Sequence, residues 1–214
     1  MNRPNVLLLD EPLGALDLKL RRQLQLELKR IQAEVGITFV YVTHDQEEAL
    51  TMSDRIAVMH AGTVEQLGTP EELYERPATR FVADFIGSTN LIRGVVEVDG
   101  SVRLSSGEVV RIAHDGLASG SDIEISIRPE SIELVPLDTA GALRGEVAMA
   151  AYLGTNMSYQ VRTAGGLVVS VLTSKAGPRR PVGNEVAVRW SPSAALVLGG
   201  GPLADATSEE EEPR

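Results

Sequence analysis

The sequence predicts two domains, an α/β domain built on a parallel sheet and an all-β domain after it. Two short apolar runs, Asn5–Leu9 and Ile37–Val42, are typical of strands buried on both faces, and residues 18–35 between them have helical spacing. Strand, helix and strand in this order favour parallel pairing. After Gly87 many short β-rich segments follow one another without helices, which favours a small barrel or sandwich.

The elements of the first domain follow from local signals. Asp17 is expected to cap the helix over residues 18–35, and Gly36 to end it. Apolar residues recur along this helix every three or four positions. The further expected elements are a short helix at Asp45–Ser53, strands at Arg55–His60 and Thr63–Leu67 joined by a turn at Ala61-Gly62, a short helix from Pro70, and another at Arg80–Ile86.

The second domain is predicted to begin near residues 87–92. Its segments are separated by Gly, Asn, Pro and Asp, which are typical turn residues. The expected strands are Leu91–Val98, Glu108–Ile112, Asp122–Ile127, Leu143–Leu153, Ser158–Arg162, Leu167–Leu172, Glu185–Trp190 and Ala195–Leu198.

Composition excludes several classes of protein. The chain has no cysteine, so it is not a disulfide scaffold, and no apolar run approaches the ~18 residues of a membrane span. Its first residues do not resemble a signal peptide, so a cytoplasmic location is expected. The formal net charge is −10, part of it in four consecutive glutamates near the C-terminus, where a disordered acidic tail is expected. The sequence shows no basic patch that would indicate nucleic-acid binding.

Polar residues follow both apolar strands of the first domain. Asp10 and Glu11 come directly after one strand, and His44 follows the other. Parallel strands end at the same edge of a sheet, so His44 should lie close to both carboxylates. Alternation along a strand sends Asp10 and Glu11 in different directions, so one can hold Mg²⁺ while the other faces a nucleophilic water. A neutral histidine there can hydrogen-bond a phosphate or that water. The alternative is that these residues only begin a polar turn.

Longer segments resemble a known family. VLLLDEPLGALD and YVTHDQEEALTMSDRIAVM are similar to the Walker B strand, D-loop and switch-histidine region of ABC-transporter ATPase subunits. GTVEQLGTPEELYERPATRFVADFIGSTN resembles the importers that carry an appended regulatory domain, with polyamine (spermidine/putrescine) importers as the nearest branch. Ile125–Glu130 resembles a signature of their OB-like (TOBE) domain. The resemblance implies the C-terminal half of a P-loop ATPase domain over residues 1–88, a TOBE domain over 89–202 and an acidic tail over 203–214.

The resemblance also implies roles for single residues. Asp10 would organise the Mg²⁺ of Mg-ATP, through water, and Glu11 would be the general base that polarises the attacking water. His44 would sense the γ-phosphate, so Glu11 and His44 are the expected catalytic pair. The D-loop, Gly14-Ala15-Leu16-Asp17, would help to assemble an ATP site shared by two subunits. Gly14 replaces a serine found in many relatives, which removes a hydroxyl contact but not the loop. These roles suit phosphoryl transfer, which needs positioning and charge neutralisation.

The family further implies partners and a location. The expected partners are transmembrane permease subunits, an extracytoplasmic solute-binding protein that acts through them, and either a second copy or a missing N-terminal half. The location would be the inner face of the membrane, as a peripheral protein. Import of a small solute, with a polyamine as the expected solute, is the expected function. No nucleic-acid partner is expected.

Two motifs of the family are missing from the sequence. None of the three lysines follows a glycine, so there is no G-x-x-x-x-G-K-[ST] loop, and the LSGGQ signature is absent too. We therefore expect the chain alone to be inactive as an ATPase. A split gene, a late start codon and a separately made half are compatible origins. The alternative function is a non-enzymatic interaction module that dimerises through the OB-like domain.

The other conspicuous side chains have ordinary interpretations beside functional ones. Tyr152, Tyr159 and Trp190 are expected in the β-domain core, with a ligand pocket or an interface as the alternative. Arg179-Arg180 is expected in a solvated turn, with contact to a partner as the alternative. Met52 is expected in the core. Charged residues on the two longer helices are expected to face solvent: Arg21, Arg22, Glu47 and Glu48.

Overall fold

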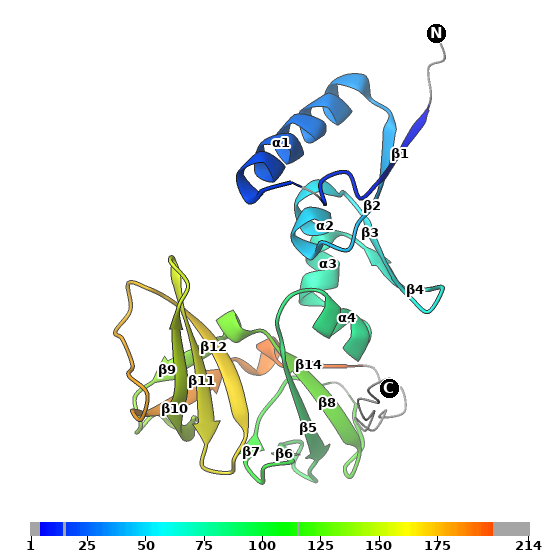
Figure 1. Cartoon of the computed structure of the whole chain (residues 1–214). Helices are drawn as coiled ribbons and strands as arrows, with labels where there is room; N and C mark the ends of the chain where they lie inside the picture. Colours follow the sequence, from blue (N-terminus) through cyan, green and yellow to red (C-terminus); the bar gives the residue numbers. More distant parts are fainter. Residues whose placement is uncertain (1–4, 15, 115, 199–214) are drawn as a thin grey trace, which may run out of the picture. The chain divides into compact units, whose positions relative to one another are not determined.

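The computed structural model describes residues 5–14, 16–114 and 116–198, and the chain separates into two compact units at Gly87/Ser88. Figure 1 shows helices and strands mixed in the first unit, and mostly strands in the second. Both units match the fold class that the sequence predicts, α/β followed by all-β. The expected acidic tail and Ala15 lie outside the described residues.

The first unit begins with a strand–helix–strand segment. Strands β1 (Val6–Asp10) and β2 (Thr38–Val42) pair in parallel, with Asp10 opposite Val42. Between them lies α1 (Leu18–Val35), which is capped by Asp17 and ends at Gly36 in the left-handed conformation (φ 67°). Parallel pairing and both caps are therefore confirmed.

A hairpin and three short helices complete this unit. Helix α2 (Gln46–Met52) follows β2, and the antiparallel strands β3 (Ile56–His60) and β4 (Thr63–Gly68) meet at a turn in which Ala61 and Gly62 both have positive φ. Helices α3 (Pro70–Glu75) and α4 (Arg80–Phe85) come next. The core of this unit lies among these later elements and consists of Ile56, Val58, Leu73, Val82 and Ile86.

The prediction that β1 and β2 are buried on both faces is wrong for the described residues. Alternate residues of both strands are exposed, and Leu8 keeps 67% of its surface accessible. The two strands form a two-stranded sheet of their own. Because side chains alternate across a strand, one face of this sheet is exposed and largely apolar: Val6, Leu8, Val40 and Val42.

The second unit contains two five-stranded antiparallel sheets. One has the order β14-β8-β5-β6-β7, and the other β12-β11-β10-β13-β9. The strands are β5 (Asn90–Val96), β6 (Val102–Leu104), β7 (Val109–Val110), β8 (Asp122–Ile127), β9 (Ile132–Val135), β10 (Leu143–Tyr152), β11 (Asn156–Thr163), β12 (Val168–Ser174), β13 (Glu185–Trp190) and β14 (Leu196–Val197), with short 3-10 turns η1 (Pro129–Ser131) and η2 (Pro192–Ala194).

Both sheets share one apolar core, in which Tyr159 and Trp190 are buried as expected. The expectation for Tyr152 is wrong: it lies at the end of β10, 59% exposed, where the Arg179 guanidinium lies 5.9 Å from its ring centroid. The backbone amide of Arg180 donates a hydrogen bond to the Tyr159 hydroxyl at 3.3 Å, which holds the loop around Arg179-Arg180 against the sheet. The strands β6 and β9 were not expected from the sequence.

Two polar side chains connect the sheets. Asn90 of β5 bonds both the amide and the carbonyl of Ser170 in β12. Glu108, just before β7, accepts hydrogen bonds from the Thr163 hydroxyl and from the Gly165 amide at 3.0 Å. Burial acts to raise the pKa of Glu108, but hydrogen bonds to its carboxylate lower it overall.

The lowered pKa of Glu108 gives a pH prediction. A folded-state pKa below the unfolded value means that the carboxylate stabilises the unit above the unfolded pKa, about 4.3, and loses this effect as pH falls further. Urea unfolding should therefore show a free-energy difference between the wild type and Glu108→Gln that shrinks below about pH 4. The same substitution at an exposed side chain, Glu146→Gln, should show a smaller difference. A constant difference for Glu108→Gln would contradict this assignment.

Candidate active site at the carboxyl ends of β1 and β2

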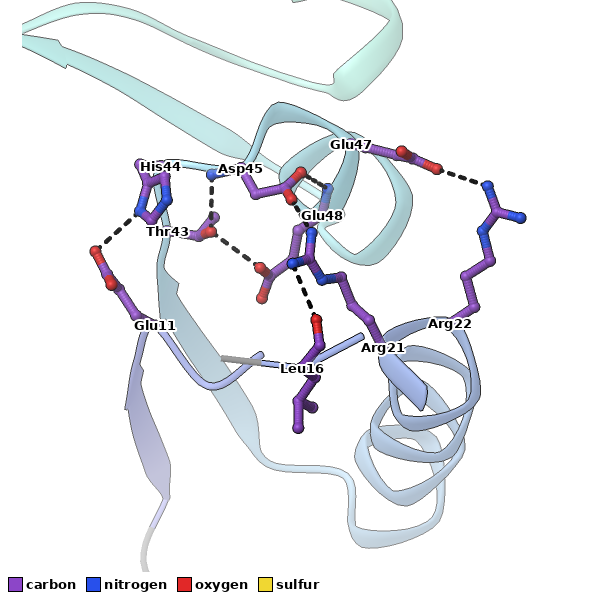
Figure 2. A network of polar contacts seen from close by, with 9 residues as sticks. All are labelled: Glu11, Leu16, Arg21, Arg22, Thr43, His44, Asp45, Glu47 and Glu48. Atoms are coloured by element: carbon purple, nitrogen blue, oxygen red, sulfur yellow. Dashed lines mark hydrogen bonds and ion pairs between the residues drawn. The ribbon is translucent and has the colours of Figure 1, made fainter. Parts of the chain in front are cut away.

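The carboxyl ends of β1 and β2 bring together the residues that the sequence singled out. The Glu11 amide donates to the Val42 carbonyl at 2.8 Å, which extends the strand pairing by one residue. Glu11 therefore leaves β1 beside the point where Thr43 and His44 leave β2 (Figure 2). Parallel strands present their carboxyl ends at one edge, the usual ligand edge of an open α/β sheet.

Glu11 and His44 form a direct pair. The His44 Nδ1 lies 3.0 Å from the Glu11 Oε1, and the two side chains are 76% and 55% exposed. Glu11 has a φ of 43°, in the left-handed region that a non-glycine residue adopts only at a cost of about 1–2 kcal/mol. The backbone thus turns sharply at Glu11 and presents its carboxylate to His44 and to solvent. The expected proximity of His44 to Glu11 is confirmed.

Asp10 ends β1 with an exposed side chain beside this pair. Among the described residues no group of three or more His, Cys, Asp or Glu side chains could hold a metal ion. A single accessible carboxylate nevertheless fits Mg²⁺ that arrives with a nucleotide, because Mg²⁺ keeps several waters and uses one or two carboxylates plus substrate phosphates. The role of Asp10 in holding Mg²⁺ stays a prediction.

The loop between β1 and α1 is folded by local bonds. Gly14 donates its amide to the Glu11 carbonyl at 3.3 Å, and Leu16 donates to Leu13 at 3.2 Å. Leu13 is buried, which anchors the loop. The Asp17 carboxylate accepts the amides of Lys19 and Leu20, each at 3.0 Å, and so caps α1. The structure gives Asp17 this capping role; the expected role of Gly14, Leu16 and Asp17 at an ATP site stays a prediction.

A polar network fixes this loop relative to His44 (Figure 2). Arg21 of α1 pairs with Asp45 at 2.5 Å and also donates to the Leu16 carbonyl at 3.3 Å. Asp45 in turn caps α2, because its side chain accepts the Glu48 amide at 3.1 Å. Arg21 therefore connects the loop before α1 directly to the residue that follows His44.

The expectation that Glu48 faces solvent is wrong, since only 2% of its surface is accessible. Its Oε2 accepts a hydrogen bond from the Thr43 hydroxyl at 3.0 Å, and Thr43 also accepts the Asp45 amide at 3.0 Å. Burial, and secondarily the charge of Glu48, raise the pKa of Tyr41. The Thr43 hydroxyl thus fixes the backbone turn around His44, and the buried Glu48 carboxylate holds that hydroxyl in place. The sequence offers one signal for this contact, because Thr43 is a hydroxyl residue directly before His44 at the end of an apolar strand.

Arg21 and Arg22 provide a matched test of this network. The Arg21 ion pair is partly buried, at 26% and 28% exposure, whereas the Arg22–Glu47 pair is about two-thirds exposed at 3.5 Å. We expect Arg21→Ala to destabilise the first unit by about 1–3 kcal/mol in urea unfolding, because Asp45 and Leu16 lose their partner. Arg22→Ala should change stability by less than about 0.5 kcal/mol. Equal effects of the two substitutions would show that Arg21 does not hold the loop.

The fold and the residues at this sheet edge agree with the class of protein that the sequence resembles. A parallel strand pair that ends in Asp-Glu and His, a capped helix between the strands, and a β unit with two sheets are what the family resemblance predicts for an ABC-transporter ATP-binding subunit. Comparisons with known proteins agree. The TOBE domain family matches residues 125–198, inside the second unit.

Three curated relatives are all named spermidine/putrescine import ATP-binding protein PotA. The Pseudomonas aeruginosa protein (PotA 1) is 53% identical over 86% of this chain, and the alignment covers 51% of that relative. The Thermobifida fusca and Rubrobacter xylanophilus proteins are 50% and 51% identical over 94% of this chain, which is 55% of each relative. Over most of its length the chain is similar to these import ATP-binding proteins. It spans about half the length of the curated relatives it matches.

A solved structure of the molybdate-bound cytoplasmic protein ModG overlaps 57% of the chain at 14% identity, with a TM-score of 0.44. Among the described residues, the structure contains no helix that is long and apolar enough to cross a membrane.

Proposed function

We propose that this chain supplies the hydrolytic half of an ATP site that energises import of a small solute, with polyamines as the solute class. The Glu11–His44 pair carries the proposal. A carboxylate that accepts a hydrogen bond from an accessible histidine can take a proton from an attacking water, while the histidine can meet the phosphate that the water attacks.

We propose a role for each residue of the site. Glu11 would act as the general base, His44 would orient the water and contact the γ-phosphate, and Asp10 would hold Mg²⁺ through water. The metal would neutralise charge on the phosphates. The loop from Gly14 to Asp17, held by Arg21, meets the second subunit of the assembly.

The exposed apolar face of β1 and β2 supports the proposal that a further segment packs against this sheet in the complete ATPase. Val6, Leu8, Val40 and Val42 leave an apolar surface uncovered on strands whose ends carry the site. We propose that a segment bearing the phosphate-binding lysine loop covers this face, and that the complete ATPase acts as a dimer. Its further partners would be membrane permeases and, through them, an extracytoplasmic binding protein. The protein would then lie at the inner face of the membrane as a peripheral subunit.

Fusion provides the test. The chain is joined at its start to the segment that the resemblance places ahead of β1, taken from the Thermobifida fusca relative, and Mg²⁺-dependent phosphate release is measured. We expect steady ATP hydrolysis by the fusion protein and none above background by the unfused chain. Uptake of labelled spermidine is then measured in cells that lack their own import ATPase, which tests whether the solute is a polyamine. If the fusion protein folds but does not hydrolyse ATP, the proposed ATPase function is rejected. The alternative, a non-enzymatic module that dimerises through the OB-like domain, is then favoured.

A further inference from the structure

The second unit contains a cavity of about 320 Å³ where the ends of β7, β10 and β13 come together. It falls within the size range of small-molecule sites, which combine an apolar lining with a few polar groups. The residues that line it are Asp99, Ser101, Val109, Val110, Arg111, Gly141, Leu143, Val188, Arg189, Trp190 and Pro192.

Part of the cavity lining is apolar. Trp190 is 9% exposed, belongs to the shared core of the two sheets, and lines this cavity. Val110 and Val188 are buried beside it. An aliphatic group that enters the cavity would therefore exchange water for contact with an aromatic ring and branched side chains.

Two opposite charges are available at the same cavity. Among the described residues, Arg111 has no ion pair or hydrogen-bond partner, although its charge acts on Asp99. The Asp99 Oδ1 accepts the Ser101 hydroxyl at 2.6 Å and the Ser101 amide at 3.0 Å. These bonds first, and Arg111 to a lesser extent, lower the pKa of Asp99, which is therefore ionised at neutral pH. Its other oxygen remains able to accept a further bond.

The remaining arginine is already neutralised. Arg189 donates to Glu133 at 2.8 Å, so this ion pair adds no net charge to the cavity. A simple anion would be repelled by Asp99, and a polyamine would be repelled by Arg111. A molecule that carries both a positive and a negative charge can pair with both residues.

We propose that this cavity binds a zwitterionic α-amino acid with an apolar side chain. Its carboxylate pairs with Arg111, its ammonium group pairs with Asp99, and its side chain lies on Trp190 and its aliphatic neighbours. The planar guanidinium of Arg111 suits bidentate recognition of a carboxylate.

Trp190 is the only tryptophan of the chain and offers a direct readout. The full chain is labelled with 5-fluorotryptophan, and its single ¹⁹F resonance is followed during titration with L-leucine. We expect a saturable shift with a dissociation constant below about 10 mM. Isovalerate and isoamylamine, which each lack one charge of leucine, should bind at least tenfold more weakly, about 1.4 kcal/mol or more per lost pair. No saturable shift with leucine, or equal binding of either analogue, would overturn the proposal.

Variants assign the two contacts. Arg111→Gln and Asp99→Asn should each weaken leucine binding at least about tenfold, and Asn at position 99 still accepts the Ser101 bonds. Arg144→Gln, an exposed change outside this cavity, should bind leucine like the wild type. Thermal unfolding followed through Trp190 confirms that each variant folds. Unchanged leucine binding in folded Arg111→Gln would also refute the assignment.

Discussion

Replacing Glu11 by glutamine should abolish most ATP hydrolysis by the fusion protein while it still binds nucleotide. Glutamine keeps the shape of the side chain and its hydrogen bond to His44, but it cannot accept a proton at neutral pH. General bases contribute about 10²- to 10⁴-fold to rate, so kcat for phosphate release should fall by at least about 10²-fold. The affinity for Mg-ATP should change little, because Glu11 acts on the water and not on the phosphates.

The matched control is Glu47→Gln, the same chemical change at an exposed carboxylate of α2. It should leave kcat within about twofold of the unmodified fusion, because its ion pair with Arg22 is solvent-screened. His44→Ala should lower kcat too. If Glu11→Gln retained wild-type turnover, the general base would lie elsewhere, and the proposed role of the β1 end would be rejected.

Much of this site could be predicted from sequence because it depends on strand order. Two apolar strands separated by one helix leave parallel pairing as the simple topology, and parallel pairing puts Glu11 next to His44. The left-handed backbone at Glu11 could not be predicted, because glutamate carries no signal for positive φ.

Burial was harder to predict than element type. Glu48 belongs to a run of charged residues, which gives no reason to expect it in the interior. Its buried carboxylate accepts a hydrogen bond from the Thr43 hydroxyl, and this tertiary contact is not visible in the charge pattern. Tyr152 ends a strand, so pattern alone cannot say whether its ring turns inward or meets Arg179. The exposed face of β1 and β2 was misjudged because an apolar run indicates what a strand can bury, and not which neighbours are present.

Strands β6 and β9 escaped prediction for a related reason. They are short, with three and four residues, and they gain their order from pairing with β5 and β13. Such segments carry little periodicity of their own, so tertiary pairing decides their structure.

Asn90→Ala should destabilise the second unit more than any surface change. Strand β12 is the last strand of its sheet, and the Asn90 side chain takes the place of a missing neighbour. Its Nδ2 donates to the carbonyls of Ser170 at 2.9 Å and Ile127 at 3.1 Å, and its Oδ1 accepts the Ser170 amide at 2.7 Å. Asn90 is 7% exposed, so water cannot easily replace these bonds.

Each orphaned polar group costs about 1–3 kcal/mol, so losing a donor and an acceptor for Ser170 should cost about 2–5 kcal/mol in urea unfolding. For a domain of this size that corresponds to a Tm roughly 10 °C lower. Trp190 fluorescence reports this unit alone, because no other tryptophan exists in the chain. Asn184→Ala, the same change at an exposed side chain, should cost less than about 0.5 kcal/mol. If Asn90→Ala were no worse than Asn184→Ala, the sheets would be held together by their apolar core without this link.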